Sequence, residues 1–274
     1  MDIARELIVA AAQFCHTDVV KFQKRCPSEL LPPSEYNAPH PNPMHAYGET
    51  YGAHREFLEF DLDQHRQLQK WCSEFGIEYS SSVWDTTSAK EITQLNPARI
   101  KVPSACNLHW EMLDYLCGNY DGEIHVSFGM TTHAEEDEII GFFESRDRTN
   151  DLIVYSCTSG YPVAFEDIGL LDIQRLRKKL EGRVKGIGFS GHHLGIAADV
   201  AAMALGAEWV ERHFTLNRTW KGTDHAASLE PDGMRRLARD LRNVNLALRN
   251  KDREVLEVER TQREKLKYSN ESSS

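Results

Sequence analysis

Two lysines and two histidines are the residues of this 274-residue chain whose surroundings best suit chemistry. Lys21 and Lys101 stand inside short apolar or β-branched runs, "VVKFQ" and "RIKVPS", where a charged ammonium group is costly unless it meets an anion. His192 and His213 follow two further apolar runs, in "GFSGHHLG" and "ERHFTL". Lysines of this kind suit a phosphate or carboxylate ligand, and a pair of histidines suits a divalent metal ion.

Other polar side chains follow the same kind of apolar run along the chain. They are Gln23, Ser82, Ser104, Ser127, Ser159, Tyr161 and Ser190. Hydroxyl groups beside two lysines would bind a phosphorylated or carboxylated small molecule. Each serine alone is more often a turn former or a helix N-cap, and two histidines without a carboxylate are a weak metal signal.

The apolar runs themselves predict seven β-strands. They lie at 19–23, 77–83, 99–104, 123–129, 151–159, 185–191 and 208–216. Helical patterns separate them, most clearly at 63–76, 133–145, 198–209 and 230–250. This alternation predicts an α/β fold with a parallel sheet and crossover helices. In such folds chemistry gathers at the carboxyl ends of the strands, which is where the polar residues stand.

The count of seven strands leaves the architecture open. A closed (β/α)8 barrel has eight strands, and an open doubly wound sheet usually has five or six. The sequence contains neither a GxGxxG loop nor a Walker loop, which weakens a nucleotide-binding interpretation. Residues 26–56 are rich in proline, and we expect no strand or helix there. In a barrel this loop would follow a strand and could cover the active mouth.

Composition bounds the class of function. The formal net charge of −10 at pH 7 disfavours a large nucleic-acid footprint. The N-terminus lacks the order of a signal peptide, and no run approaches the ~20 apolar residues of a membrane span, so we expect no membrane partner. Cysteines without a CxxC pair indicate reduced thiols and a cytoplasmic location. The residues alone predict a barrel-like enzyme acting on a phosphorylated or carboxylated small molecule.

Ordered motifs over nearly the whole chain resemble those of the sialic acid synthases, that is, N-acetylneuraminate synthase and its legionaminate, pseudaminate and spore-coat polysaccharide relatives. The motifs are "VVKFQ", "YGAHREFLEFDLDQH", "SSSVWD", "IKVPS", "VSFGM", "SCTSGYP", "GFSGHHLG", "ERHFTL" and "DHAASLEP". Several motifs in order are far more specific than any one of them. Condensing barrels that make deoxy-octulosonate or deoxy-heptulosonate sugars share the chemistry, but "SCTSGYP" and "GFSGHHLG" favour the sialate branch.

The resemblance implies a (β/α)8 TIM-type barrel over residues 1–262, here without its first β-strand, and a polar tail at 263–274 that we expect to be disordered. It implies condensation of phosphoenolpyruvate with an N-acetylmannosamine-type aldehyde sugar, an amino sugar, to give a nonulosonic 2-keto acid and phosphate. A Mn²⁺ or Mg²⁺ ion would be the cofactor. A homodimer is a further expectation.

The resemblance also assigns roles to single residues. Lys21, Lys101 and Tyr161 would be catalytic, and His192 and His213 would be the metal ligands. The residues that would contact phosphoenolpyruvate are Lys21, Ser82, Lys101, Ser104, Ser127, Ser159 and Ser190. Those that would face the sugar are Gln23, Tyr161 and Asp224. His193 receives no role, and we expect it to face solvent.

The chain departs from the family pattern in several places. The family begins with a strand carrying a Glu and an Asn-His pair, whereas this chain starts at the helix that follows, "MDIARELIVAA", which accounts for the seven strands. Cys106 stands where many relatives have Glu, and Gly191 where Asp is usual. The antifreeze-like domain that follows the barrel in relatives is not found either.

These departures leave three explanations open. The chain is a working synthase with a different or relaxed acceptor, or it is a truncated or non-catalytic homologue that binds a phosphorylated ligand or serves as a scaffold. A gene start upstream of Met1 is the third.

Overall fold

A single parallel sheet forms the centre of the computed structural model, which describes residues 1–222 and 224–268. Its seven strands are β1 (Val19–Lys24), β2 (Glu78–Val83), β3 (Arg99–Val102), β4 (Glu123–Ser127), β5 (Leu152–Cys157), β6 (Gly186–Gly191) and β7 (Trp209–Arg212). Each strand falls at a position predicted from the apolar runs, and most of the strands are shorter than the predicted run. The predicted α/β class and parallel arrangement are confirmed.

The sheet curves into a barrel that is open on one side. Its strands lie side by side in chain order, and in the described residues β1 and β7 form the two edges without pairing to each other. A closed barrel of this type would need an eighth strand between them. The fold is therefore the predicted barrel with one strand fewer.

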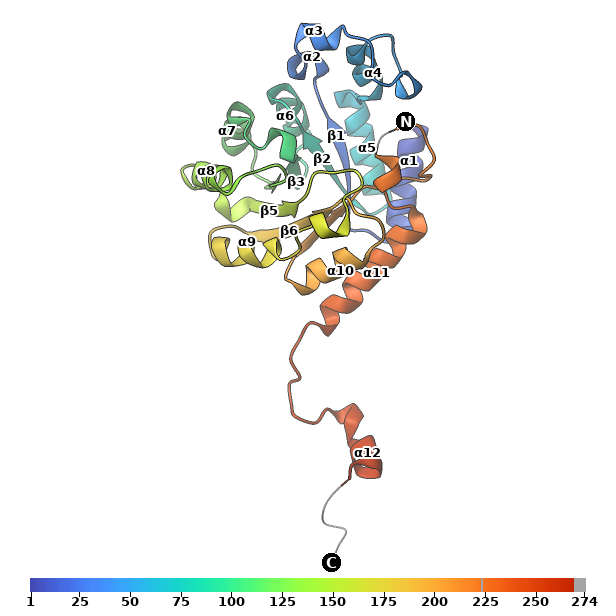
Figure 1. The fold of residues 1–274 in the computed structure, drawn as a ribbon, viewed down its shortest axis with the longest axis vertical. Helices are drawn as coiled ribbons and strands as arrows, with labels where there is room; N and C mark the ends of the chain where they lie inside the picture. The colour runs from blue at the N-terminus through green and yellow to red at the C-terminus, as the bar shows by residue number, and fades with distance from the viewer. Residues whose placement is uncertain (223, 269–274) are drawn as a thin grey trace, which may run out of the picture.

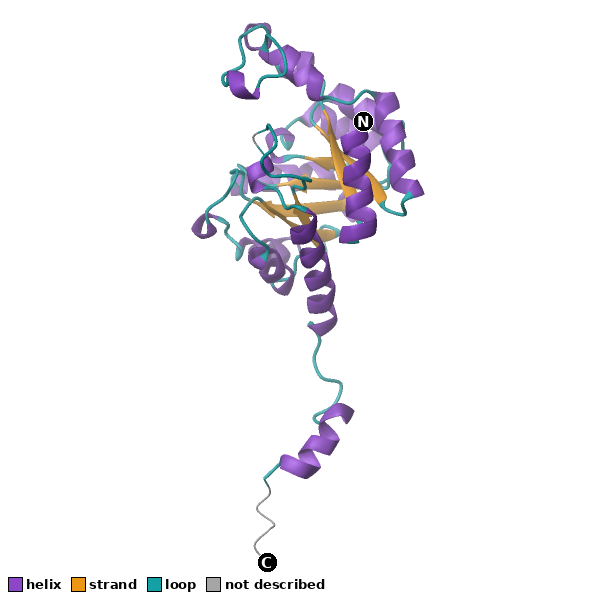
Figure 2. Cartoon of the chain, turned by 90° about the vertical axis from the view of Figure 1, so that its right-hand side faces the viewer, coloured by secondary structure: helices purple, strands orange, loops and turns teal. Residues whose placement is uncertain are grey.

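Helices cover the outer surface of this sheet (Figures 1 and 2). They are α1 (Asp2–Val9) with its π-helical continuation η1 (Ala10–Cys15), α5 (Leu62–Glu74), α6 (Thr86–Thr93), α7 (Trp110–Asn119), α8 (His133–Glu144), α9 (Asp172–Leu180), α10 (Ala197–Ala204) and α11 (Pro231–Ala247). The helices expected at 63–76, 133–145, 198–209 and 230–250 correspond to α5, α8, α10 and α11. None of the helices in the described part of the chain has the length and apolar character of a transmembrane span.

Alternation along the strands decides which side chains enter the barrel. In β3, Ile100 and Val102 belong to the apolar core that the sheet forms with its helices. Lys101 lies between them and points to the opposite face, because successive side chains of a strand alternate. In β4, Val126 packs in the same core while Ser127 points inward. The alternating pattern thus delivers polar groups to the barrel interior.

Two helical segments close the outside of the open edge. Cys15 at the end of η1 packs with Leu229, which precedes α11, and with Met234 and Leu237 of α11. The Cys15 thiol also donates to the Pro231 carbonyl oxygen at 3.4 Å. Behind these helices, between β1 and β7, lies a cavity of about 1070 Å³. The helical layer is therefore continuous where the sheet is not.

The proline-rich segment is a place where the sequence prediction was wrong. Residues 26–56, expected to hold no helix, contain α2 (Pro27–Leu30), α3 (Pro33–Tyr36), the 3-10 turn η2 (Pro43–His45) and most of α4 (Tyr51–Leu58). Each of the first three has a proline in its first turn, where the missing N–H costs nothing and the fixed φ favours a helix. This segment, here called the lid, lies beyond the carboxyl end of β1 (Figure 1).

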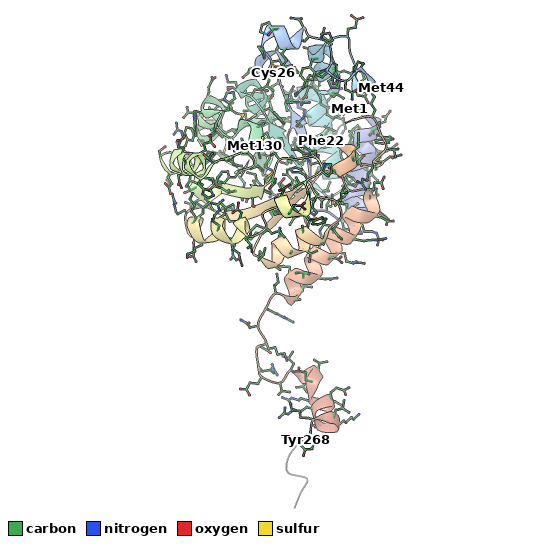
Figure 3. The ribbon with its side chains drawn as sticks, in the orientation of Figure 1. Met1, Phe22, Cys26, Met44, Met130 and Tyr268 are labelled. Carbon is green, nitrogen blue, oxygen red and sulfur yellow. The ribbon has the colours of Figure 1, made fainter. Side chains whose placement is uncertain are left out.

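A C-terminal arm leaves the barrel after α11. It ends in α12 (Glu257–Leu266), which crosses the boundary expected between 262 and 263. Figure 3 shows Tyr268 on this arm, away from the barrel, and Val258 and Tyr268 are 81% and 84% exposed. Residues 269–274 of the expected tail lie outside the described residues.

Candidate active site

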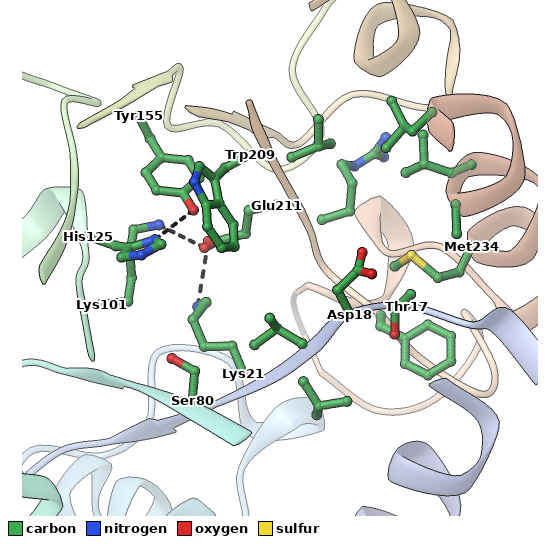
Figure 4. Close-up of a pocket in the computed structure, with 18 of the residues that line it drawn as sticks. Thr17, Asp18, Lys21, Ser80, Lys101, His125, Tyr155, Trp209, Glu211 and Met234 are labelled. Atoms are coloured by element: carbon green, nitrogen blue, oxygen red, sulfur yellow. Dashed lines mark hydrogen bonds and ion pairs between the residues drawn. The ribbon is translucent and has the colours of Figure 1, made fainter. Parts of the chain in front are cut away.

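Lys21, Lys101 and Glu211 meet inside the barrel from β1, β3 and β7 (Figure 4). The Lys101 Nζ atom lies 2.8 Å from one carboxylate oxygen of Glu211, and the Lys21 Nζ atom lies 3.5 Å from the other. Lys21 also donates to the hydroxyl of Ser82 at 2.7 Å. Two ammonium groups share one carboxylate, so this group keeps an excess positive charge that suits an anionic ligand.

Glu211 is the residue that sequence reasoning missed. It stands two positions before His213 on the same run, so strand alternation places both side chains on one face. Burial by itself would raise the pKa of Glu211, but Lys101 and Lys21 hold it well below its usual range. Burial also lowers the pKa of Lys21, against the opposing effect of Glu211. The carboxylate therefore stays ionised.

Lys101 is fixed from a second side by an aromatic ring. Its Nζ atom lies 4.1 Å from the centre of the Tyr155 ring, and its side chain is only 3% exposed. The Tyr155 hydroxyl is in turn 2.8 Å from Nδ1 of His125, one strand away. The ammonium group is thus held in place before any ligand arrives, which lowers the entropy cost of binding.

Two predicted serines converge above Gly129, which follows β4. The Gly129 N–H donates to the Ser104 hydroxyl at 3.0 Å. A Cβ atom at position 129 would lie 2.4 Å from the Ser159 hydroxyl and 2.7 Å from that of Ser104. Only glycine leaves room for this approach. The three loops after β3, β4 and β5 thereby form a small cradle of hydroxyl groups.

The two predicted metal ligands lie side by side with Tyr161. The ring centres of His192 and His213 are 5.2 Å apart, and the Tyr161 ring lies 4.5 Å from the first and 5.6 Å from the second. Nδ1 of His192 donates to the Thr158 carbonyl oxygen at 2.9 Å, which leaves the lone pair of Nε2 available to coordinate a metal ion. Burial lowers the pKa of both imidazoles, to about 4 for His213.

These neutral imidazoles fit two positions around a divalent ion. Asp224 lies close, with one carboxylate oxygen 3.7 Å from Nδ1 of His213. Among the described residues, no group of three or more His, Cys, Asp or Glu side chains is arranged to hold a metal ion.

Most of the predicted site residues belong to one of these three groups. Ser190 joins Lys21, Ser82 and Lys101 around Glu211, with its hydroxyl 3.5 Å from a Glu211 oxygen. Gln23 lines the cavity at the open edge, which Lys21, Lys101 and His213 also line. Ser127 is buried, and its carbonyl oxygen accepts from the Asn107 side chain at 2.9 Å. The role assigned to each residue stays a prediction.

His193 does not face solvent, contrary to expectation. It is fully buried beside Asp199 and Arg212. Arg212 lies 2.5 Å from Asp199 and donates to the His193 carbonyl oxygen, also at 2.5 Å. A Cβ atom at Gly191 would lie 2.9 Å from the His193 ring. The His193 ring fills the space that a side chain at position 191 would need. The glycine at 191 and the histidine at 193 in "GFSGHHLG" therefore depend on each other.

The chain is similar to known proteins over most of its length. Residues 7–253 match the sequence model of the NeuB family. N-acetylneuraminate-9-phosphate synthase of Homo sapiens is 34% identical over 266 residues, which cover 97% of this chain and 72% of the human protein. N,N'-diacetyllegionaminic acid synthase of Campylobacter jejuni is 29% identical over 251 residues, or 90% of this chain and 73% of that protein.

A solved structure supports the fold independently. The N-acetylneuraminic acid synthetase of Leptospira borgpetersenii superposes with a TM-score of 0.80 at 23% identity, over 98% of this chain and 88% of that one. Its likeness extends across the barrel and its helices. The sequence match over residues 7–253 and the shared barrel show that this chain belongs to the NeuB family, the phosphoenolpyruvate-condensing nonulosonic acid synthases.

Proposed function

We propose that the chain condenses phosphoenolpyruvate with an open-chain N-acetylmannosamine-type aldehyde sugar, forming a nonulosonic acid and releasing phosphate. The observation that supports this most is the pairing of Lys21 and Lys101 on one carboxylate, which leaves an excess positive charge inside the barrel. Phosphoenolpyruvate carries a phosphate and a carboxylate that this charge would offset. Relatives in the family are named for different nonulosonic acids. Membership of the family therefore supports the condensation, and the choice of acceptor sugar is a further step of the proposal.

The arrangement of hydroxyl groups suggests how phosphoenolpyruvate would lie. Ser82 and Ser190 flank the charged group, and Ser104 and Ser159 form the cradle above Gly129. The two ammonium groups would hold the anionic ends of the ligand, while the hydroxyls donate hydrogen bonds to its oxygens. Lys101 and Lys21 lower the pKa of Glu211, and we assign this carboxylate the role of positioning the two lysines.

A divalent ion, Mn²⁺ or Mg²⁺, would be held by His192 and His213 and would supply polarisation of the aldehyde oxygen. The Tyr161 ring lies against both imidazoles. Burial raises the pKa of Tyr161 to about 12, so its hydroxyl stays protonated and can donate to the sugar. Gln23 and Asp224 would contact the rest of the sugar.

The reaction proposed for this site forms one carbon–carbon bond. The enol carbon of phosphoenolpyruvate attacks the aldehyde carbon, whose oxygen takes a proton and becomes a hydroxyl group. Water then adds at the phosphate-bearing carbon and gives up its protons, and the bond from that carbon to the phosphate oxygen breaks. The products are a 2-keto acid and inorganic phosphate. The lysines would stabilise the anions in both steps.

A second candidate, a non-catalytic homologue that binds a phosphorylated ligand, is favoured by two observations. The barrel is open between β1 and β7, which leaves a cavity beside Lys21. Cys106, in the position where relatives often have a carboxylate, is buried, and burial raises the pKa of its thiol to about 12. A neutral thiol cannot replace an ionised carboxylate in charge or in acid–base exchange.

One assay separates the two candidates. The protein is incubated with phosphoenolpyruvate, Mn²⁺ and a panel of aldehyde sugars, and free phosphate and 2-keto acid are both measured. We expect the two products in equal amounts with at least one sugar. Binding of phosphoenolpyruvate without phosphate release for any sugar would instead establish the non-catalytic candidate.

A further inference from the structure

The two histidines assigned to the metal ion stand one residue beyond the last backbone pair of their strands. In the parallel ladder of β6 and β7 the final pair is Gly191 and Arg212. His192 and His213 follow directly, and their ring centres are 5.2 Å apart. The hydrogen bonds between the two strands therefore no longer fix the spacing of these imidazoles, and another contact is needed.

The Arg212 side chain supplies such a contact. One guanidinium nitrogen donates to the Gly195 carbonyl oxygen at 2.8 Å, and the other donates to the His193 carbonyl oxygen at 2.5 Å. Both carbonyl groups belong to the loop that carries His192. A single side chain of β7 thus holds the loop after β6 at two points. It does so on the face opposite to His213, because successive side chains of a strand alternate.

Asp199 and the His193 ring keep the guanidinium in position. Asp199, in the first turn of α10, lies 2.5 Å from the Arg212 nitrogen that donates to the loop. Nε2 of His193 lies 3.2 Å from this nitrogen and 3.3 Å from the Asp199 carboxylate. All three side chains are buried. A planar guanidinium fixed in this way can hold several acceptors at once, which the ammonium group of a lysine on its flexible stem does less well.

The other side of His192 is held by the loop after β5. The His192 carbonyl oxygen accepts from the Val163 N–H at 3.1 Å, and its Nδ1 atom donates to the Thr158 carbonyl oxygen at 2.9 Å. Neither contact involves β7, the strand that leads into His213. Arg212 therefore connects the strand of one imidazole with the loop of the other.

We propose that Arg212 is a positioning residue for the metal site, and that its guanidinium sets the distance between His192 and His213 by tying the loop after β6 to β7. Asp199 and His193 orient the guanidinium. This inference rests on the metal ligands of the proposed function, and it adds residues that do not touch the metal ion. Loss of an outer contact of this kind typically weakens metal binding by about 10- to 100-fold.

Arg212→Lys removes the fork and keeps the positive charge. The lysine can still pair with Asp199, but its single nitrogen cannot serve both carbonyl groups in the same geometry. Calorimetric titration with Mn²⁺ alone should show binding at least about 10-fold weaker than in the wild type. In the condensation assay, the Mn²⁺ concentration for half-maximal rate should rise by the same factor, whereas kcat at saturating Mn²⁺ should stay within about 2-fold.

A matched control is available in Arg148, whose side chain is 12% exposed. It also pairs with an aspartate, Asp151, at 3.1 Å, and it donates to the carbonyl oxygens of Cys117 and Gly122 at 2.9 and 3.0 Å. It precedes β5, at the amino end of the strands and away from the two histidines. Arg148→Lys should lower the free energy of unfolding and leave the affinity for Mn²⁺ unchanged.

The double variant Arg212→Met with Asp199→Leu separates positioning from stability. It leaves no buried charge of the pair without a partner, so it should be nearly as stable as the wild type. It has no donor for the His193 and Gly195 carbonyl groups, so Mn²⁺ should still bind at least about 10-fold more weakly. Thermal unfolding and Mn²⁺ titration of the same samples measure both quantities.

Two results would overturn the role of Arg212. One is wild-type affinity for Mn²⁺ in Arg212→Lys or in the stable double variant. The other is an equal loss of affinity in Arg148→Lys, which would mean that the metal site responds to stability alone. Wild-type protein that binds no Mn²⁺ would instead refute the assignment of His192 and His213, and this inference with it.

Discussion

The Nζ atom of Lys101 lies 2.8 Å from a carboxylate oxygen of Glu211, deep inside the barrel. Lys21 shares the same carboxylate from the other side at 3.5 Å. The single negative charge of Glu211 therefore stabilises both lysine ammonium groups inside the protein. Removing this charge is more disruptive than removing a surface carboxylate, because buried ions without a partner are costly.

Glu211→Gln should lower the free energy of unfolding by about 3 kcal/mol. Saturating phosphoenolpyruvate should recover much of this loss, because its own charges would replace the missing carboxylate. Thermal unfolding with and without phosphoenolpyruvate measures both effects. Glu254→Gln, on the exposed arm, serves as the control. An equal loss in the presence and absence of phosphoenolpyruvate would contradict the assignment of this group as its binding site.

Gly129→Ala tests the hydroxyl cradle. A Cβ atom 2.4 Å from the Ser159 hydroxyl must push the two serines apart. We expect phosphoenolpyruvate to bind about 10-fold more weakly, the loss of one or two hydrogen bonds to a charged ligand. Titration of phosphoenolpyruvate measures the change. Gly118→Ala, in α7 with open space at its Cβ position, should leave binding unchanged. Unaltered binding in Gly129→Ala would remove the cradle from the site.

His213→Ala should abolish the dependence of the reaction on Mn²⁺, since only one imidazole of the pair would remain. The binding of Mn²⁺ itself, followed by calorimetry, provides a readout that needs no substrate. His225→Ala, in the same region of the chain but bonded to Thr215 at 2.8 Å, is the control. Unchanged Mn²⁺ binding and activation in His213→Ala would refute its assignment as a ligand.

Two buried histidines predict how stability varies with pH. Burial lowers the pKa of His65 and of His125 from 6.5 to about 4. Between these values the unfolded chain binds protons that the folded chain does not, so stability rises with pH from about 4 to about 6.5. Each histidine contributes about 3 kcal/mol to this rise.

Urea unfolding at several pH values measures this slope, and His65→Gln should remove one histidine's share of it. His133→Gln, at an exposed position, should leave the slope as it is. A slope that is equally steep in His65→Gln would show that other groups carry the acid sensitivity.

Arg212 and Asp199 form a buried pair that supports the loop carrying His192. Arg212→Met should destabilise the protein by about 3–5 kcal/mol, because Asp199 would remain buried and charged. The double variant with Asp199→Leu should recover most of the loss, since two apolar side chains need no partner. Denaturant unfolding of the single and double variants gives the coupling energy. Additive losses would contradict the pairing.

The sequence predicted the strands because each one alternates between core and interior residues. In β3, Ile100 and Val102 face the core and Lys101 between them faces the barrel interior. A lysine at such an interior position indicates an anion-binding site. Glu211 was missed because a charged residue between a tryptophan-containing run and an arginine looks like an ordinary strand end. Its partners come from β1 and β3, and no local pattern shows which strands will face each other.

The two incorrect predictions have different physical causes. Proline disfavours the interior of a helix, but Pro27 and Pro33 stand in the first turn of α2 and α3, where proline is tolerated. His193 was placed in solvent because its partners, Asp199 and Arg212, lie on α10 and β7. A polar residue in a glycine-rich turn looks exposed until a buried acid and a buried base are brought to it by the fold.

The unpaired edges of the sheet bear on how this protein folds. Within the described residues, every strand pairs only with its neighbours in the chain, so each pairing can follow the synthesis of one strand–helix unit. A closed barrel must in addition join its first and last strands, with the entropy loss of closing a very long loop. Here the two edges of the sheet are bridged by side-chain packing of η1 on α11. Cys15 of η1 contacts Pro231 of α11, which lies 216 residues away in the sequence. The sheet itself therefore needs no pairing between its first and last strands, and the contact between η1 and α11 joins the first and last helical segments of the barrel.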